Sequence, residues 1–219
     1  MRQNVSLAEI SDGHLYKAND MVKADCGGCE GCSQCCRGMG SSIILDPYDV
    51  YRLTTGIGKS MQELLATSVE LNVVDGVILP NLKMQGTREA CAYLDTEGRC
   101  SIHPYRPGIC RLFPLGRHYE NGGLFYFLQT GECAKENRSK VKVSKWIDTP
   151  ELKRNEQFKL QWHDLLSAMT DRVAGEDEGK QREENLLLLR LFYLLPYEGT
   201  TDFYSQFMER MEHWNEQIG

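Results

Sequence analysis

Several features that quickly assign a chain to a function class are missing from these 219 residues. The longest apolar run, 186–195, is only ten residues long and contains Arg190, which is too short and too charged for a membrane span. The chain has 25 basic and 31 acidic residues, and the net charge of −6 is divided evenly between its two halves. We therefore expect neither a nucleic-acid partner nor a membrane partner.

The sequence also lacks common cofactor and targeting signatures. It contains no Gly-x-Gly-x-x-Gly motif, no Gly-Lys-Ser/Thr phosphate loop and no C-x3-C-x2-C spacing of a standard radical enzyme. The opening residues, MRQNVSLAEISDGH, have no apolar stretch typical of a secretory signal. We expect a cytoplasmic protein, in which disulfides would be rare.

Cysteine, in contrast, is abundant, with nine residues. Five of them fall in the segment CGGCEGCSQCC and four are spread over the next hundred residues. Buried structural cysteines would not cluster in this way, and the odd number does not suit a disulfide framework. The distribution predicts metal ligation by a set of cysteines: Cys26, Cys29, Cys32, Cys35, Cys36, Cys91, Cys100, Cys110 and Cys133.

The spacing of the first cysteines favours an iron–sulfur cluster over zinc. Cys26, Cys29, Cys32 and Cys36 fit C-x2-C-x2-C-x3-C, the spacing of bacterial ferredoxin loops, although Arg37 replaces the usual proline. Zinc would combine a C-x2-C knuckle with two distant cysteines, because one zinc ion takes at most four thiolates. The surplus of thiols favours a multinuclear centre or two separate sites, and thiol chemistry without metal is the third alternative.

The second group of cysteines occupies a proline-rich segment. Cys91 and Cys100 bracket an expected turn at Thr96–Gly98. Prolines at 107 and 114 predict an extended, kinked path through Cys110. These cysteines are expected to reach the first group as ligands, unless one or two of them are simply core thiols.

The chain as a whole reads as α+β. We expect a small irregular cysteine-rich domain with short strands and helices over 1–148, followed by a helical C-terminal region over 149–219. Expected helices lie near 47–55, with Asp46 as N-cap, near 61–71, with a Ser60–Glu63 capping box, over 150–174, up to Leu195 after a charged turn, and from 203 to 218. Strands are expected at 43–45, 124–130 and 141–143, and a hairpin over 72–84.

These motifs resemble a known family. C-x2-C-x2-C-C over 29–36, with C-S-I-H-P-Y-R-P-x2-C-R-L-F-P over 100–114, is similar to the YkgJ-type cysteine-cluster family, described as a zinc- or iron-chelating CxxCxxCC domain. The resemblance covers about 26–133 and implies a cysteine-ligated metal centre. A related module occurs in flagellin lysine N-methylases, which implies protein modification as one role. Cys26 extends the usual motif, and His103 replaces a frequent tyrosine as a candidate nitrogen ligand.

Three arginines flank the cysteines and complete the candidate cofactor-binding set with His103: Arg37, Arg106 and Arg111. Guanidinium groups beside thiolates would offset their charge, raise a cluster's potential or hold an anionic substrate. Ordinary surface salt bridges for the arginines, and packing against Pro104 and Tyr105 for His103, are the alternatives.

The first functional hypothesis is an iron–sulfur protein with a redox or protein- or peptide-modification role. The alternatives are a zinc-stabilised, non-catalytic interaction module and an accessory protein that delivers metal. Each alternative leaves room for a protein partner or protein substrate. The sequence leaves open whether the chain is an enzyme, which substrate it takes and what oligomeric state it adopts.

Overall fold

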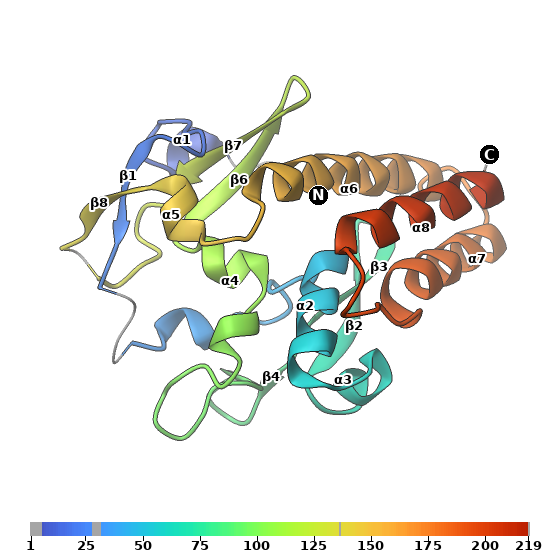
Figure 1. Cartoon of the computed structure of the whole chain (residues 1–219), viewed down its shortest axis with the longest axis horizontal. Helices are drawn as coiled ribbons and strands as arrows, with labels where there is room; N and C mark the ends of the chain where they lie inside the picture. Colours follow the sequence, from blue (N-terminus) through green and yellow to red (C-terminus); the bar gives the residue numbers. More distant parts are fainter. Residues whose placement is uncertain (1–5, 28–31, 136, 219) are drawn as a thin grey trace.

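A computed structural model describes residues 6–27, 32–135 and 137–218 and has the expected α+β architecture (Figure 1). The cysteine-bearing half contains short elements. They are α1 Leu7–Ile10, β1 Met21–Asp25, the 3-10 turn η1 Gln34–Cys36, α2 Pro47–Ile57, α3 Met61–Thr67, β2 Val69–Val74, β3 Val77–Leu82, β4 Met84–Gln85, β5 Ala90–Cys91, the 3-10 turn η2 His103–Tyr105, α4 Gly108–Leu112, β6 Leu115–Glu120, β7 Gly123–Leu128, β8 Ser139–Lys142 and α5 Val143–Ile147.

The C-terminal part consists of long helices. They are α6 Leu152–Val173, α7 Glu178–Leu189, the π-helical turn η3 Arg190–Leu194 that continues α7, and α8 Phe203–Ile218. The long helices lie together at one end of the molecule, and α2, α3 and the β2–β3 hairpin lie against them (Figure 1). None of the described helices is long and apolar enough to cross a membrane.

The strands of the described residues pair in twos, all antiparallel: β1 with β8, β2 with β3, β4 with β5, and β6 with β7. The β2–β3 hairpin turns at Asp75 and Gly76, both with positive φ, as the Asp-Gly signal predicts. The β1–β8 pair joins residues far apart in the sequence, with Met21 opposite Lys142. The expected strand at 43–45 is only a single bridge from Ile44 to Asn81.

Helix starts follow the predicted capping chemistry more closely than helix ends do. The Asp46 carboxylate accepts from the Asp49 amide at 3.0 Å at the start of α2, and the Ser60–Glu63 capping box starts α3. However, α3 ends at Thr67 and not at 71, because Val69 already pairs with Leu82 in the hairpin. The charged segment after 174 is only partly a turn, since α7 begins at Glu178 with Asp177 as its N-cap.

Two hydrophobic cores organise the chain. The larger core joins buried residues between 43 and 102 to buried residues of α6, η3 and α8, so both predicted regions contribute to it. The smaller core lies under β1, β6–β7 and α5 and includes Leu112 of α4. The expected boundary at 148/149 stays a prediction. Helix α4 reaches both cores, because its Cys110 packs against the larger one.

Candidate metal centre

The first cysteine segment is held beside the second by backbone contacts. After η1, Arg37 pairs with Ala90 in a single β-bridge, and the Gly38 N–H donates to the Glu89 carbonyl at 2.9 Å. Ala90 is the residue before Cys91 in β5. The pairing therefore brings Cys35 and Cys36 to the edge of the β4–β5 hairpin.

The segment from Cys91 to Cys100 closes on itself. Leu94 forms a bridge with Cys100, and the Asp95 carboxylate accepts from the Arg99 amide at 2.8 Å. The turn expected at 96–98 is present, with Gly98 at φ 76°. Cys91 and Cys100 therefore lie at the two ends of one short segment that folds back on itself.

The third segment differs from the prediction, because Cys110 lies in a helix and not in an extended strand. The preceding turn ends at Tyr105, and Pro107 is the N-cap residue of α4, which starts at Gly108. The carboxylate of Asp49, from α2, accepts the Gly108 N–H at 2.7 Å. This distant carboxylate caps a helix that sequence spacing alone does not announce.

These segments bring five thiols within electrostatic reach of one another. In Cys36, a hydrogen bond from Cys35 lowers the thiol pKa, whereas the nearby thiols of Cys91, Cys100 and Cys110 act to raise it. The same hydrogen bond, with burial, raises the pKa of Cys35. Burial raises the pKa of each of the other three thiols. A metal ion would favour the thiolate forms, since the thiolate is the ligand.

The five thiols suit a metal centre by their chemistry, although they do not converge on one point. Within the described ranges, no three side chains of His, Cys, Asp or Glu enclose a single metal ion. Sulfur donors without nitrogen or oxygen partners are the ligands of zinc and of iron–sulfur clusters. Either metal would therefore fit this donor set.

The remaining predicted ligands lie elsewhere or outside the description. Cys26 directly follows β1, whose last residue, Asp25, pairs with Ser139 at the start of β8. Cys133 is half-buried in the loop before β8, so it lies on the segment that returns to this sheet. Cys32 is half-buried before η1, and Cys29 lies outside the described residues.

The three predicted arginines have different environments. The pKa of Cys35 is raised by the hydrogen bond with Cys36 and by burial, and that of Cys100 by burial, while the positive charge of Arg106 opposes both rises. Arg111, next to Cys110, donates to the carbonyls of Pro104 and Asp148. Arg37 donates through Nε to the Ser33 hydroxyl at 3.4 Å. Arg106 thus has the most direct electrostatic link to the thiols.

His103 lies in η2, and its backbone N–H donates to the Cys100 carbonyl at 3.2 Å. Its side chain is exposed, and burial of part of the ring together with Arg106 and Arg111 lowers its pKa. The structure thus places the imidazole close to Cys100 in the chain but at the surface. Its role as a nitrogen ligand stays a prediction.

Residues that the sequence did not single out surround α4, and one of them, Asp49, acts on the pKa of the Cys110 thiol. They are Asp49 and Arg52 from α2, Arg117 from β6 and Lys159 from α6. Lys159 is buried and forms an ion pair with Asp46. A lysine on the buried face of α6 was the available signal, but its partner, Asp46, lies 113 residues earlier.

Comparison with family models agrees with a metal centre formed by cysteine thiols. Residues 28–139 match the family CxxCxxCC, described as "Putative zinc- or iron-chelating domain". The chain belongs to the CxxCxxCC family. The matched residues include every cysteine except Cys26, and all of the five grouped thiols. Neither the curated proteins nor the solved structures give a match.

Membership of the CxxCxxCC family agrees with the resemblance seen in the cysteine motifs. The family description names zinc and iron as alternatives and does not choose between them. The three long helices, α6, α7 and α8, all lie beyond the matched residues. The family therefore accounts for the metal-binding part of the chain and leaves the chemistry open.

Proposed function

We propose that this protein binds an iron–sulfur cluster through four of the five grouped thiols, and that the cluster serves a redox or protein-modification reaction. The proposal rests on five thiols from three separate segments that lie within electrostatic reach of one another: Cys35, Cys36, Cys91, Cys100 and Cys110. A closed zinc site and a cubane cluster each take four cysteines, so either would leave one of the five thiols for another role.

The surroundings of the thiols support a cluster. Cys91, Cys100 and Cys110 pack against the larger hydrophobic core, so water has limited access to them. The positive charge of Arg106 acts on Cys35 and Cys100 and would offset part of the negative charge of ligated thiolates. Burial and nearby charge are two of the terms that set a cluster's reduction potential.

A second metal position is the companion proposal. Cys26, Cys29, Cys32 and Cys133 remain when the five grouped thiols are set aside. Because Asp25 pairs with Ser139, Cys26 and the segment that follows Cys133 lie at the same end of the β1–β8 sheet. These cysteines would hold a second cluster or a transferable metal ion. A reducing compartment such as the cytoplasm would keep all nine thiols available.

Metal and sulfide analysis of the full chain, purified without oxygen, tests the proposal. Iron and acid-labile sulfide in near-equal amounts, with a broad brown absorption band, are the expected results. One or two zinc ions per chain, without sulfide or colour, would overturn the cluster. That result would favour a zinc-stabilised interaction module or a metal-delivery protein.

A further inference from the structure

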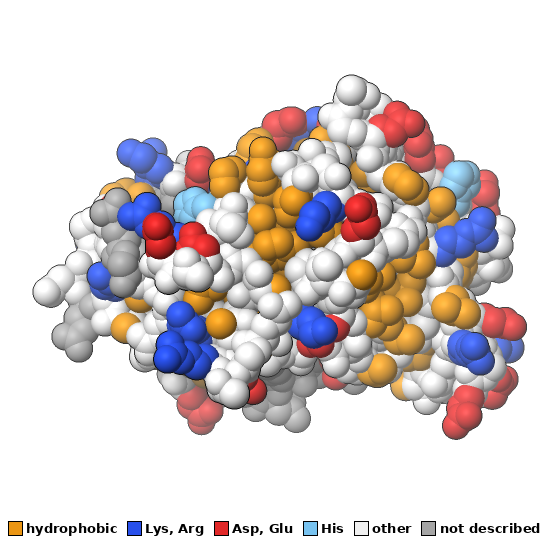
Figure 2. Space-filling view, turned by 90° about the horizontal axis from the view of Figure 1, so that it is seen from below, with side chains coloured by type: hydrophobic (Ala, Val, Ile, Leu, Met, Phe, Trp, Pro, Cys, Tyr) orange, Lys and Arg blue, Asp and Glu red, His pale blue; other side chains and the backbone are white. Residues whose placement is uncertain are grey.

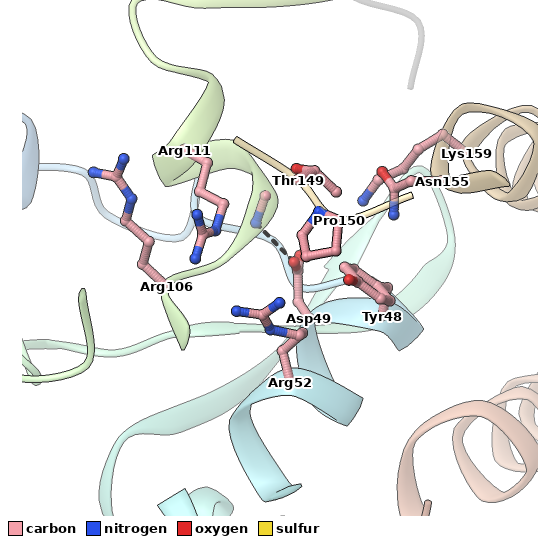
Figure 3. A pocket seen from close by; sticks show the side chains of 10 residues that line it. Tyr48, Asp49, Arg52, Arg106, Arg111, Thr149, Pro150, Asn155 and Lys159 are labelled. Carbon is pink, nitrogen blue, oxygen red and sulfur yellow. Dashed lines mark hydrogen bonds between the residues drawn. The ribbon is translucent and has the colours of Figure 1, made fainter. Parts of the chain in front are cut away.

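A narrow pocket lies between α2, α4 and the start of α6 (Figure 3). Four cationic side chains line it, and Asp49 is the one carboxylate among its lining residues. The lining cations are Arg52, Arg106, Arg111 and Lys159. Such a concentration of positive charge at one narrow position calls for a negative partner.

The carboxylate of Asp49 does not neutralise these cations through hydrogen bonds. Its Oδ1 accepts the Gly108 N–H at 2.7 Å, and its Oδ2 accepts the Asp46 N–H at 3.2 Å. Both oxygens are therefore used to hold the backbone at the start of α2 and α4. Asp49 fixes the pocket wall, while its charge offsets only one of the surrounding cations.

The guanidinium groups of Arg52 and Arg111 converge although both are positive. Each donates through Nη2 to the same acceptor, the Pro104 carbonyl, with Arg52 at 2.6 Å. In Figure 3 both groups lie beside Asp49. A guanidinium has five N–H donors, so most of those on Arg52 and Arg111 have no acceptor in the contacts of the described chain.

The acidic partners of Lys159 and Arg111 do not neutralise all of the positive charge in the pocket. Lys159 is paired with Asp46, and Arg111 lies 3.8 Å from an Asp148 carboxylate that is 87% exposed. An exposed carboxylate at that distance screens little of the guanidinium charge. In Figure 3 the guanidinium of Arg106 points away from Asp49 and from Arg52. An oxyanion would supply acceptors for the remaining donors of Arg52 and Arg111.

We propose that this pocket binds a compact oxyanion, the terminal carboxylate or phosphate of a small-molecule ligand, between Arg52 and Arg111. The pocket has room for about one water molecule, so the oxyanion enters with an oxygen first while the rest of the ligand stays at the mouth. Gly108 and Arg111 of helix α4 line the pocket, and Cys110 of the same helix is one of the five grouped thiols. The bound anion would therefore lie next to the metal centre, whichever metal that centre holds.

Titration of the full metal-containing chain with inorganic phosphate, and separately with acetate, tests the proposal by calorimetry at constant ionic strength. Saturable binding of at least one anion is expected, and the tighter one identifies the class of terminal group. Arg52→Gln should weaken that binding at least about tenfold, because a charge-assisted hydrogen bond is lost. The matched control is Arg182→Gln, an exposed position on α7, which should leave the affinity unchanged.

A second pair of variants tests the pocket without changing any charge. A Cβ at Gly108 would lie 3.2 Å from Arg117 Nη2 and 3.4 Å from both Asp49 Oδ1 and Lys159 Nζ. Gly108→Ala should therefore crowd the pocket and weaken anion binding several-fold. Gly175→Ala, where the added Cβ meets only the Arg172 carbonyl at 3.8 Å, is the control.

Two results would overturn the inference. One is the absence of saturable binding by the unmodified protein. The other is an equal loss of affinity in Arg52→Gln and Arg182→Gln, which would indicate general attraction by surface charge. Metal content measured on the same samples distinguishes this outcome from failure of the cluster proposal. Arg52 lies on α2 and is not adjacent in the sequence to any grouped cysteine, so its substitution should leave the metal content unchanged.

Discussion

The helical end of the molecule and the cysteine-bearing part are stabilised in different ways. In the helical end, aromatic rings pack against one another, with ring centroids of Phe158 and Phe207 4.8 Å apart and those of Trp162 and Phe192 5.1 Å apart. In the cysteine-bearing part, short elements carry half-buried thiols: Cys35 and Cys36 in η1, Cys91 in β5 and Cys110 in α4. Apolar burial contributes to both regions. The thiol-bearing turns depend, in our account, also on metal ligation.

The surface shows the difference between the helical end and the cysteine-bearing part less clearly than the interior does. Figure 2 shows acidic and basic side chains dispersed over the visible face, with apolar side chains gathered between them. The exposed large apolar residues of the described chain include Val73 on β2 and Leu186 on α7. The contrast between the two regions therefore lies in the interior and is best tested by changing buried groups.

Phe158→Ala should have the largest effect on global stability. The side chain is 1% exposed and touches the rings of Phe203 and Phe207, so its removal should lower the free energy of unfolding by about 3–5 kcal/mol. Urea unfolding measures this loss, and Leu186→Ala, at a position 54% exposed, should change stability little. Metal bound per folded molecule should stay the same. Loss of metal from folded Phe158→Ala protein would contradict the separation of the two regions.

Removal of metal should have the complementary effect. With a chelator, amide exchange should accelerate about tenfold or more around Cys91 to Cys110, since the ligated segments lose their cross-links. Exchange in the middle of α6 should change little, because ring packing and not metal holds that helix. Hydrogen exchange followed by mass spectrometry compares the two. Equal acceleration in both regions would show that the metal stabilises the whole chain.

A smaller effect is expected where the two regions meet, at Asp49. Burial raises the pKa of this carboxyl to about 6, above its ordinary value near 4. The folded state then binds more protons than the unfolded state between about pH 4 and pH 6, so stability falls as pH rises through that window. The slope is at most about 1.4 kcal/mol per pH unit. Above pH 6 this contribution becomes constant.

Asp49→Asn should remove that slope while the amide oxygen still accepts the Gly108 N–H. Urea unfolding of both proteins between pH 4 and pH 8 provides the comparison. An exposed carboxylate on α8, Glu209, offers the control Glu209→Gln, which should leave the slope in place. An unchanged slope in Asp49→Asn would show that another group causes the pH dependence.

Local sequence signals predicted the local parts of this fold. Capping residues gave the starts of α2 and α3, Asp75-Gly76 gave the hairpin turn, and periodic apolar residues gave α6 and α8. Such signals act within one or two turns of chain, where a side chain reaches its own backbone. They therefore predict element starts and turns better than the points at which tertiary pairing ends an element.

The candidate site could be predicted only in its residue types. The cysteine spacing indicates metal, but the grouping of Cys35 and Cys36 with Cys110 depends on a bridge at Arg37 and a helix at α4. The prolines around Cys110 suggested extended chain, and the Asp49 cap explains why a helix forms there instead. No short-range sequence pattern connects α2, α4 and α6, so the pocket between these helices could not be predicted from the sequence.

The most direct test of the central claim is the iron content of single Cys→Ser variants, measured with sulfide on protein purified without oxygen. Cys110→Ser should lose most of its cluster iron, because this thiol belongs to the buried group around Cys91 and Cys100. Cys133→Ser should keep that iron, because this thiol lies in the loop before β8. Full iron in Cys110→Ser, or equal loss of all iron and sulfide in both variants, would contradict the assignment of the cluster to the grouped thiols.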